Sequence, residues 1–209
     1  MKLSKKTVFI SALITLFPCI VGLLLWNRLP DVMATHFSAD NTANGWSSKP
    51  FTVFGIPAIL AGIQLLCLWA TANDPRKKNI NEKLFAVVVW TVPAISQICC
   101  LSVYAVALNK KVNIGLLANL IIGALFLLIG NYLPKAKQNY TVGIKLPWTL
   151  NSEENWNRTH RMAGWLWMLG GLAMIVNAFF LSTAVLVVVL CGVVLPPAIY
   201  SYLLFKKGI

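Results

Sequence analysis

Runs of about 20 apolar residues recur along this chain of 209 residues. A helix of that length crosses the roughly 30 Å hydrocarbon core of a bilayer, where backbone polar groups must be satisfied within the protein. A transmembrane barrel would instead need segments of about ten residues with alternating polarity, which the sequence lacks. Only 11% of the residues are charged, against about 25% in a soluble domain. The pattern therefore predicts an all-α membrane protein.

Six such runs predict six transmembrane helices, at about residues 7–26, 51–72, 84–108, 113–133, 162–181 and 183–205. We expect an N-terminal module, 1–108, with an outer loop at 29–50, and a C-terminal module, 109–209, with a cytoplasmic loop at 134–161. With both termini inside, 14 of the 18 Lys and Arg residues face the cytoplasm, as the positive-inside rule requires. This placement accounts for the net charge of +12, so we expect no direct nucleic-acid binding.

The interiors of the six spans hold no charged side chain and no histidine. Their buried amides are expected to form hydrogen bonds between helices: Gln64, Gln97, Asn119 and Asn177. Small residues in the fourth and fifth spans predict close helix contact: Gly115, Ala118, Gly123, Gly130, Gly164, Gly170 and Gly171. The absence of charge at membrane depth argues against an ion-coupled transporter.

The outer loop is rich in Asn, Asp, Gly, Ser and Pro, which predicts turns. Its candidate functional residues are His36, Phe37, Trp46, Asp31 and Asp40. The two aromatic residues suit either an anchor at the membrane interface or a surface that meets an apolar ligand at the outer leaflet. One histidine near two carboxylates is a weak metal pattern, so we interpret His36 as a pH-sensitive or hydrogen-bonded loop anchor and predict no metal site.

The cytoplasmic loop begins with a basic stretch that contains Lys135, Lys137 and Lys145. Basic residues with aromatic neighbours beside a bilayer are typical of contact with anionic lipid. The loop then changes character, and a helix is expected to start outside the hydrocarbon and to continue into the fifth span.

The start of that helix can be predicted from residue spacing. Asn151 is the expected N-cap, and Glu154 follows three residues later. Glu154 and Arg158 are four residues apart in the order that favours an ion pair. Trp156 and His160 have the same spacing, which places them together on one helix face.

The two histidines, His36 and His160, are expected on opposite sides of the membrane, so they cannot share a metal or a proton relay. The sequence offers no Ser–His–Asp or Cys–His set in their place. We therefore predict that the protein is not an enzyme and has no catalytic residue and no cofactor. A small-molecule or peptide transporter remains the main alternative. An enzyme at the membrane interface, with either histidine as acid or base, is a lesser one.

The cytoplasmic loop resembles the SdpI family, bacterial immunity proteins against a sporulation-delaying toxin. The resemblance is carried by Gly130-Asn131, Leu133-Pro134-Lys135, Asn139, Val142-Gly143-Ile144, Pro147-Trp148-Thr149-Leu150, Trp156 and Thr159-His160-Arg161. The outer loop looks like the domain of unknown function (DUF) that commonly precedes this family, through Leu29-Pro30, His36-Phe37, Gly45 and Ser48-Lys49. One departure is visible, because Lys145-Leu146 stands where relatives commonly have Arg-Thr, and the planar guanidinium fork is lost.

The resemblance implies a multi-pass protein of the bacterial plasma membrane that protects its cell from a secreted, membrane-active peptide toxin. It also implies a second partner, a small cytoplasmic repressor held at the membrane. The outer loop would face the toxin. Contact with the repressor or with membrane lipid would fall to Asn131, Lys135, Asn139, Gly143, Lys145, Pro147, Trp148, Trp156, His160 and Arg161.

Overall fold

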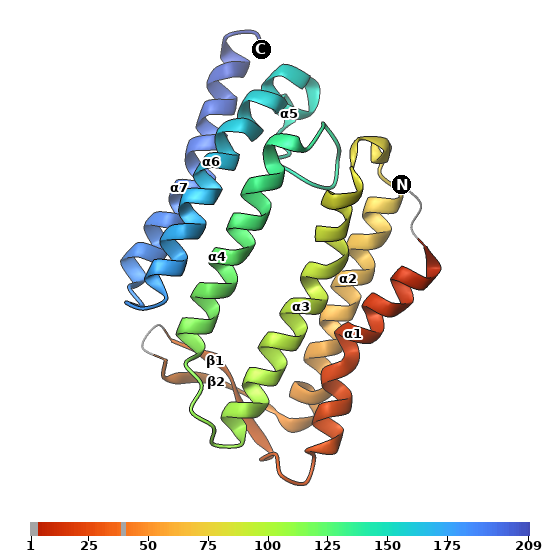
Figure 1. The fold of residues 1–209 in the computed structure, drawn as a ribbon, viewed down its shortest axis with the longest axis vertical. Coiled ribbons are helices and arrows are strands. Elements are labelled where there is room, and N and C mark those ends of the chain that lie inside the picture. The colour runs from red at the N-terminus through yellow and green to blue at the C-terminus, as the bar shows by residue number, and fades with distance from the viewer. Residues whose placement is uncertain (1–3, 39–40) are drawn as a thin grey trace. The chain divides into compact units, whose positions relative to one another are not determined.

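The computed structural model describes residues 4–38 and 41–209, and it is mostly helical (Figure 1). The chain divides into two compact units. The N-terminal unit comprises the described residues up to 72 together with 85–115, and the C-terminal unit comprises 73–84 and 116–209. Among the described residues, five helical stretches are long and apolar enough to cross a membrane: Lys5–Leu24, Phe51–Ala72, Glu82–Ala107, Ile114–Lys135 and Thr183–Lys206.

Helix α6 (Glu153–Asn177), which covers most of the expected fifth span, is not among those five. Its first nine residues, 153–161, are largely polar, which shortens its apolar part. The helix does start before the apolar run and continue through it, as predicted. The predicted N-cap is wrong by one position, because Ser152 Oγ accepts a hydrogen bond from the Asn155 N–H at 3.1 Å. The chain is still extended at Ser152, the geometry that an N-cap requires.

The N-terminal unit contains α1 (Lys5–Leu24), the π-helical turn η1 (Phe51–Gly55), α2 (Ile56–Ala72) and most of α3 (Glu82–Ala107). Proline has no N–H, so within a helix it leaves the carbonyl four residues earlier without its usual partner. Pro18 and Pro93 lie inside α1 and α3.

Side chains from neighbouring helices donate hydrogen bonds to both of these freed carbonyls. Gln97 Nε2 donates to Ile14 O, four residues before Pro18, at 2.5 Å. Gln64 Nε2 donates to Val89 O, four residues before Pro93, at 2.7 Å. The prediction that both glutamines bond between helices is confirmed.

The outer loop is not built of turns alone, and the expectation of an all-α chain is wrong here. Strands β1 (Val32–Phe37) and β2 (Ala43–Ser48) form an antiparallel hairpin within the N-terminal unit. The register is irregular next to His36. Strand β2 is rich in residues with low β-propensity, and the pair has a contact beyond the backbone ladder, between the hydroxyls of Thr35 and Ser47 at 2.9 Å.

In the C-terminal unit, α4 (Ile114–Tyr132) leads through the 3₁₀ turn η3 (Leu133–Lys135) to α5 (Pro147–Asn151), α6 and α7 (Thr183–Lys206). Helices α4 and α6 meet at two pairs of glycines. A Cβ on Gly130 would lie 2.8 Å from Gly164 O, and one on Gly171 would lie 2.8 Å from Gly123 O. Larger residues would force the backbones apart, which confirms the predicted close contact.

Helices α6 and α7 run antiparallel and side by side (Figure 1). Asn177, at the end of α6, donates to Asn119 Oδ1 of α4 at 2.9 Å, so these two predicted interhelical amides are also confirmed. Trp167 Nε1 donates to Val193 O at 3.0 Å, and this carbonyl lies four residues before Pro197. The C-terminal unit therefore repeats the proline-and-donor arrangement of the N-terminal unit.

Replacing Gln64 with Leu should lower the free energy of unfolding by about 1–3 kcal/mol, because Val89 O is then buried without a partner. The loss should shrink by at least half in a Pro93→Ala background, where residue 93 regains an N–H that can donate to Val89 O. Denaturation of the purified protein in detergent, run as a double-mutant cycle, measures this coupling.

The control cycle combines Gln64→Leu with Pro18→Ala, whose freed carbonyl is bonded by Gln97 instead. Those two changes should be additive. An equal loss from Gln64→Leu in the wild-type and Pro93→Ala backgrounds would contradict the proposed pairing.

Candidate functional site

Two polar segments of the C-terminal unit fold against each other, residues 73–81 and residues 133–161, and together we call them the polar cap. Asp74 is only 4% exposed and joins the two segments. Its Oδ1 accepts from the Arg76 N–H at 2.7 Å. Its Oδ2 accepts from the Tyr140 N–H at 2.8 Å and from the Thr141 hydroxyl at 2.7 Å. A buried carboxylate with three donors is a strong local tether.

Gln138 adds a second connection between the segments. Its side-chain oxygen accepts from the Arg76 guanidinium, and its backbone carbonyl accepts from Asn79 Nδ2 at 2.7 Å. Gln138 Nε2 in turn donates to Thr149 O at 2.7 Å. The Arg76 guanidinium also lies 5.1 Å from the centre of the Tyr140 ring. The short segment after α2 is therefore fixed to the longer loop at several points.

Asn139 closes the turn at the centre of the longer loop and is fully buried. Its Oδ1 accepts from the N–H groups of Thr141 at 3.0 Å and Val142 at 2.6 Å. Its Nδ2 donates to Lys137 O at 2.8 Å and to Val142 O at 2.9 Å. Asparagine is needed here because a single side chain supplies both acceptor and donor.

Trp156 and His160, on consecutive turns of α6, form the centre of the cap. Their rings stack with centroids 3.9 Å apart, and each residue is at most 1% exposed. Trp156 Nε1 donates to Ala136 O at 2.7 Å. The Ile144 N–H donates to His160 Nε2 at 2.9 Å, so the ring proton sits on Nδ1, which donates to Trp156 O at 2.8 Å.

Burial lowers the pKa of His160 from 6.5 to about 4 and outweighs the opposite effect of the hydrogen bond to Trp156 O. The imidazole is therefore neutral near pH 7. Both of its nitrogens are bonded within the cap, which gives the ring no free position for proton transfer. Its place in the structure is that of a buried connector between α6 and the loop.

Gly143 explains why the loop can approach this pair of rings. Its φ of +129° is strained for any other residue, and a Cβ there would lie 2.5 Å from His160 Nε2 and 2.8 Å from the Trp156 ring. The Val142-Gly143-Ile144 sequence therefore belongs to the same structural unit as the two rings.

Helix α5 connects the cap to α7. Pro147 begins this short helix, and the buried Thr149 hydroxyl accepts from the Leu146 N–H at 2.9 Å. The Trp148 ring stacks on Phe205 with centroids 5.8 Å apart and meets Tyr202 edge-on at 5.4 Å. Aromatic contacts thus hold the end of α7 against α5.

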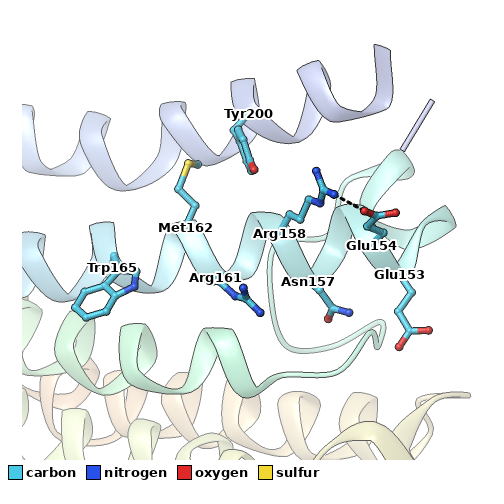
Figure 2. A pocket seen from close by; sticks show the side chains of 8 residues that line it. All are labelled: Glu153, Glu154, Asn157, Arg158, Arg161, Met162, Trp165 and Tyr200. Atoms are coloured by element: carbon cyan, nitrogen blue, oxygen red, sulfur yellow. Dashed lines mark hydrogen bonds and ion pairs between the residues drawn. The ribbon is translucent and has the colours of Figure 1, made fainter. Parts of the chain in front are cut away.

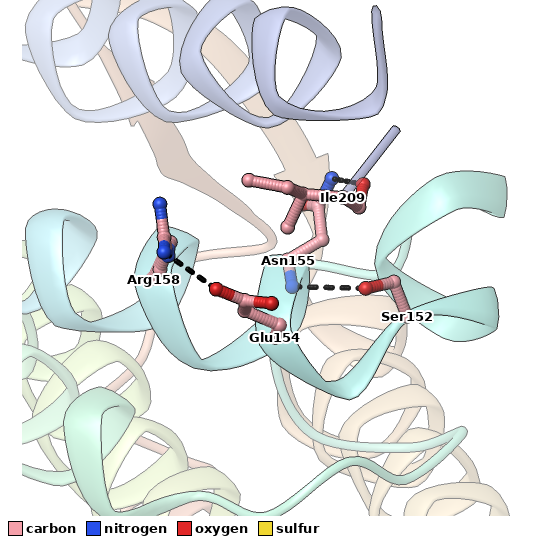
Figure 3. A network of polar contacts seen from close by, with 5 residues as sticks. All are labelled: Ser152, Glu154, Asn155, Arg158 and Ile209. Carbon is pink, nitrogen blue, oxygen red and sulfur yellow. Dashed lines mark hydrogen bonds and ion pairs between the residues drawn. The ribbon is translucent and has the colours of Figure 1, made fainter. Parts of the chain in front are cut away.

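A second polar contact lies deeper between α6 and α7. Asn155 Nδ2 donates to Ser201 O at 2.9 Å and to Ile209 O at 3.1 Å. The Ser201 hydroxyl returns a hydrogen bond to Asn155 Oδ1 at 2.8 Å. Figure 3 shows Asn155 beside its cap Ser152 and the Glu154–Arg158 pair, whose atoms are 2.5 Å apart, as the predicted spacing requires.

The predicted cytoplasmic residues separate into two groups. Those brought together inside the cap are Asn139, Gly143, Trp148, Trp156 and His160. Those that are exposed are Asn131, Lys135, Lys145, Pro147 and Arg161. A role for either group in binding stays a prediction, but only the second group is placed to contact a partner directly.

Three residues of the network were missed by sequence reasoning: the buried Asp74 and Asn155, and the half-buried Gln138. Asp74 is the only carboxylate in the loop between α2 and α3 before Glu82, and that isolation among basic residues was the available signal. The amides carried no such signal, because their partners lie 46 or more residues away in the sequence or within an irregular loop.

The hairpin places the predicted outer residues within the N-terminal unit. His36 Nδ1 lies 2.5 Å from Asn44 Oδ1, so the histidine is hydrogen-bonded as expected. Asp31 pairs with Lys49 at 2.9 Å. Trp46 is 61% exposed, and Phe37 is half-buried. The predicted residue Asp40 lies outside the described residues.

Across residues 4–38 and 41–209, no group of three or more His, Cys, Asp and Glu side chains is arranged to hold a metal ion. The arrangement of the cap is suited to rigid presentation of a surface. The fold and the cap define a class, a multi-pass helical membrane protein with a folded polar cap on its C-terminal unit.

Comparison with known proteins specifies this class further. Residues 135–201 match the SdpI/YfhL protein family, and residues 13–61 match a domain of unknown function, DUF1648. Over 206 residues the chain is 28% identical to the immunity protein SdpI of Bacillus subtilis strain 168, and the alignment covers 97% of each chain. No solved structure matches the chain. The predicted resemblance to the SdpI family, and to the module that precedes it, is confirmed.

Replacing Asp74 with Asn should loosen the polar cap. Three donors now bond the two carboxylate oxygens of Asp74, whereas the amide of Asn has only one acceptor oxygen. A loss of about 1.5–3 kcal/mol is expected for a hydrogen-bonded charged group. Limited trypsin digestion in detergent, followed by mass spectrometry, should show faster cleavage after Lys137 and Lys145. Asp31→Asn is the control, since that carboxylate is 97% exposed, and it should leave the cleavage rates unchanged. Equal cleavage in Asp74→Asn and wild type would contradict the tether.

The stability of the C-terminal unit should depend on pH through His160. The folded state resists protonation down to about pH 4, whereas the unfolded chain accepts a proton near pH 6.5. Stability is therefore complete above pH 6.5 and falls toward pH 4, by on the order of 3 kcal/mol. Melting curves between pH 8 and pH 4 should show this slope in the wild type and in His36→Gln. The slope should be smaller in His160→Gln, and an identical slope in all three proteins would refute the assignment.

Proposed function

We propose that this chain is an integral membrane immunity protein that protects its cell from a secreted, membrane-active peptide toxin. The observation that carries the proposal is the alignment with an immunity protein over 97% of both chains. The matched SdpI/YfhL segment, 135–201, also coincides with the residues that form most of the cap and its contacts with α7. The similarity thus extends over the part of the chain with the most elaborate side-chain packing.

For this function we propose the six-span topology, with both termini in the cytoplasm. Five stretches have the length and composition of membrane spans, and α6 would supply the sixth. The distribution of Lys and Arg supports this orientation. The hairpin precedes α2 in the chain and the segment 73–81 follows it. If α2 crosses the membrane in this topology, the hairpin and the segment 73–81 face opposite sides of the membrane.

In the proposed topology, the hairpin and the polar cap have different partners. The hairpin faces the outside and would meet the toxin, with Trp46 and Val32 both exposed, at 61% and 59%. Exposed aromatic and aliphatic side chains beside a membrane surface suit an apolar peptide. The polar cap faces the cytoplasm, where the exposed residues Lys135 and Lys145 would be available to a small repressor or to lipid.

Expression of this chain in a toxin-sensitive bacterium should raise the toxin dose required for killing. Trp46→Ala should reduce that protection about tenfold, the effect of losing one aromatic anchor worth about 1.4 kcal/mol. Trp69→Ala is the matched control, because Trp69 is 65% exposed but lies on α2, and it should protect like the wild type. Survival curves and membrane immunoblots measure protection and expression together.

Unchanged killing in cells with confirmed membrane expression would exclude the immunity function against that toxin. Full protection by Trp46→Ala would leave immunity standing and would remove the hairpin from toxin contact. Lys145→Ala should keep full protection, since the cap lies on the opposite side in this topology.

A further inference from the structure

An open groove of about 850 Å³ lies along the exposed face of α6, next to α7. Figure 2 shows its lining, with Glu154, Asn157, Arg158, Arg161 and Trp165 from α6 and Tyr200 from α7. None of the bonds that build the polar cap uses the side chains of Asn157, Arg161 or Trp165. The groove therefore begins on the exposed face of the cap, apart from its hydrogen-bonded interior, and has no part in the proposed contact with toxin.

The residues of the groove change from polar to apolar along one helix face. Asn157, Arg161 and Trp165 of the groove are each four residues apart, and Leu169 follows one turn beyond the groove, so all four line up along α6. All four side chains are exposed, Trp165 by 66% and Leu169 by 60%. Polar groups, then an indole, then an aliphatic surface is the order in which a membrane protein meets headgroups, the interface and acyl chains.

The charges of the groove leave one cation without an acidic partner. Arg158 is paired with Glu154 at 2.5 Å. Arg161 makes no hydrogen bond or ion pair with any residue that the structure describes. The other carboxylate, Glu153, lies two helical turns away, at the polar end of the groove. Arg161 thus presents a planar set of N–H donors at the level where the apolar surface begins, a geometry that matches phosphate.

We propose that this groove binds a membrane phospholipid through its phosphodiester group. Arg161 and Asn157 donate to the phosphate oxygens, Trp165 lies at the level of the ester groups, and an acyl chain lies along Leu169. Tyr200 forms the α7 side of the site. The ligand is a lipid rather than free phosphate, because the exposed Trp165 and Leu169 would contact acyl chains and would make no favourable contact with a soluble anion.

Native mass spectrometry of the delipidated protein in detergent tests this site. Phosphatidylglycerol should bind at least tenfold more tightly than diacylglycerol with the same chains, which lacks the phosphate. Arg161→Gln should reduce phosphatidylglycerol binding about tenfold. Lys137→Gln removes the same charge from an exposed side chain of the polar cap outside the groove, and it should bind like the wild type.

Three results would overturn the proposal. They are equal binding of the two lipids, equal losses in Arg161→Gln and Lys137→Gln, and binding of glycerol 3-phosphate as tight as that of the lipid. A second measurement needs no change to Arg161. Brominated phosphatidylglycerol should quench part of the tryptophan fluorescence of the wild type, and Trp165→Phe should lose that quenched part. Undiminished quenching in Trp165→Phe would place the lipid elsewhere.

Discussion

The structure depends on one constraint, that a carbonyl inside hydrocarbon must be bonded to a donor from the protein. Pro18 in α1, Pro93 in α3 and Pro197 in α7 each free one carbonyl, and a side chain from a packed neighbour donates a hydrogen bond to each of these three. The donors are Gln97, Gln64 and Trp167. Such a bond has a fixed partner and direction, whereas aliphatic contact between helices has neither. The prolines thus specify which helix faces meet within each unit.

The polar cap follows the same logic in a region that is not hydrocarbon. Asp74, Asn139 and His160 are buried, and each side chain bonds backbone groups of the loop. The close glycine contacts of α4 and α6 bring the two ends of the loop together, so that one turn of α6 can hold it. A loop with so many fixed points presents a defined surface, which is what a soluble partner or a headgroup requires.

The features that the sequence predicted well are local or periodic. The apolar runs, the glycine pairs and the stacking of Trp156 on His160 all follow from spacing along one helix. Asp74 could not be assigned in this way, since two of its three partners, Tyr140 and Thr141, lie more than 60 residues away. The hairpin was missed because its strands lack β-branched alternation and depend on pairing with each other. The cap of α6 fell on Ser152 rather than Asn151 because α5 continues through Asn151.

Helix α6 has a consequence for the membrane itself. After its polar start, the apolar part from Met162 to Asn177 has 16 residues, which extend about 24 Å as a helix. The hydrocarbon of a typical bilayer is about 30 Å thick. In the proposed six-span topology, a bilayer around this helix would thin locally, or draw headgroups inward, at a modest energetic cost for each ångström of mismatch. The protein would then be surrounded by a shallow depression in one leaflet, which would favour its residence in thin or strongly curved regions of the membrane.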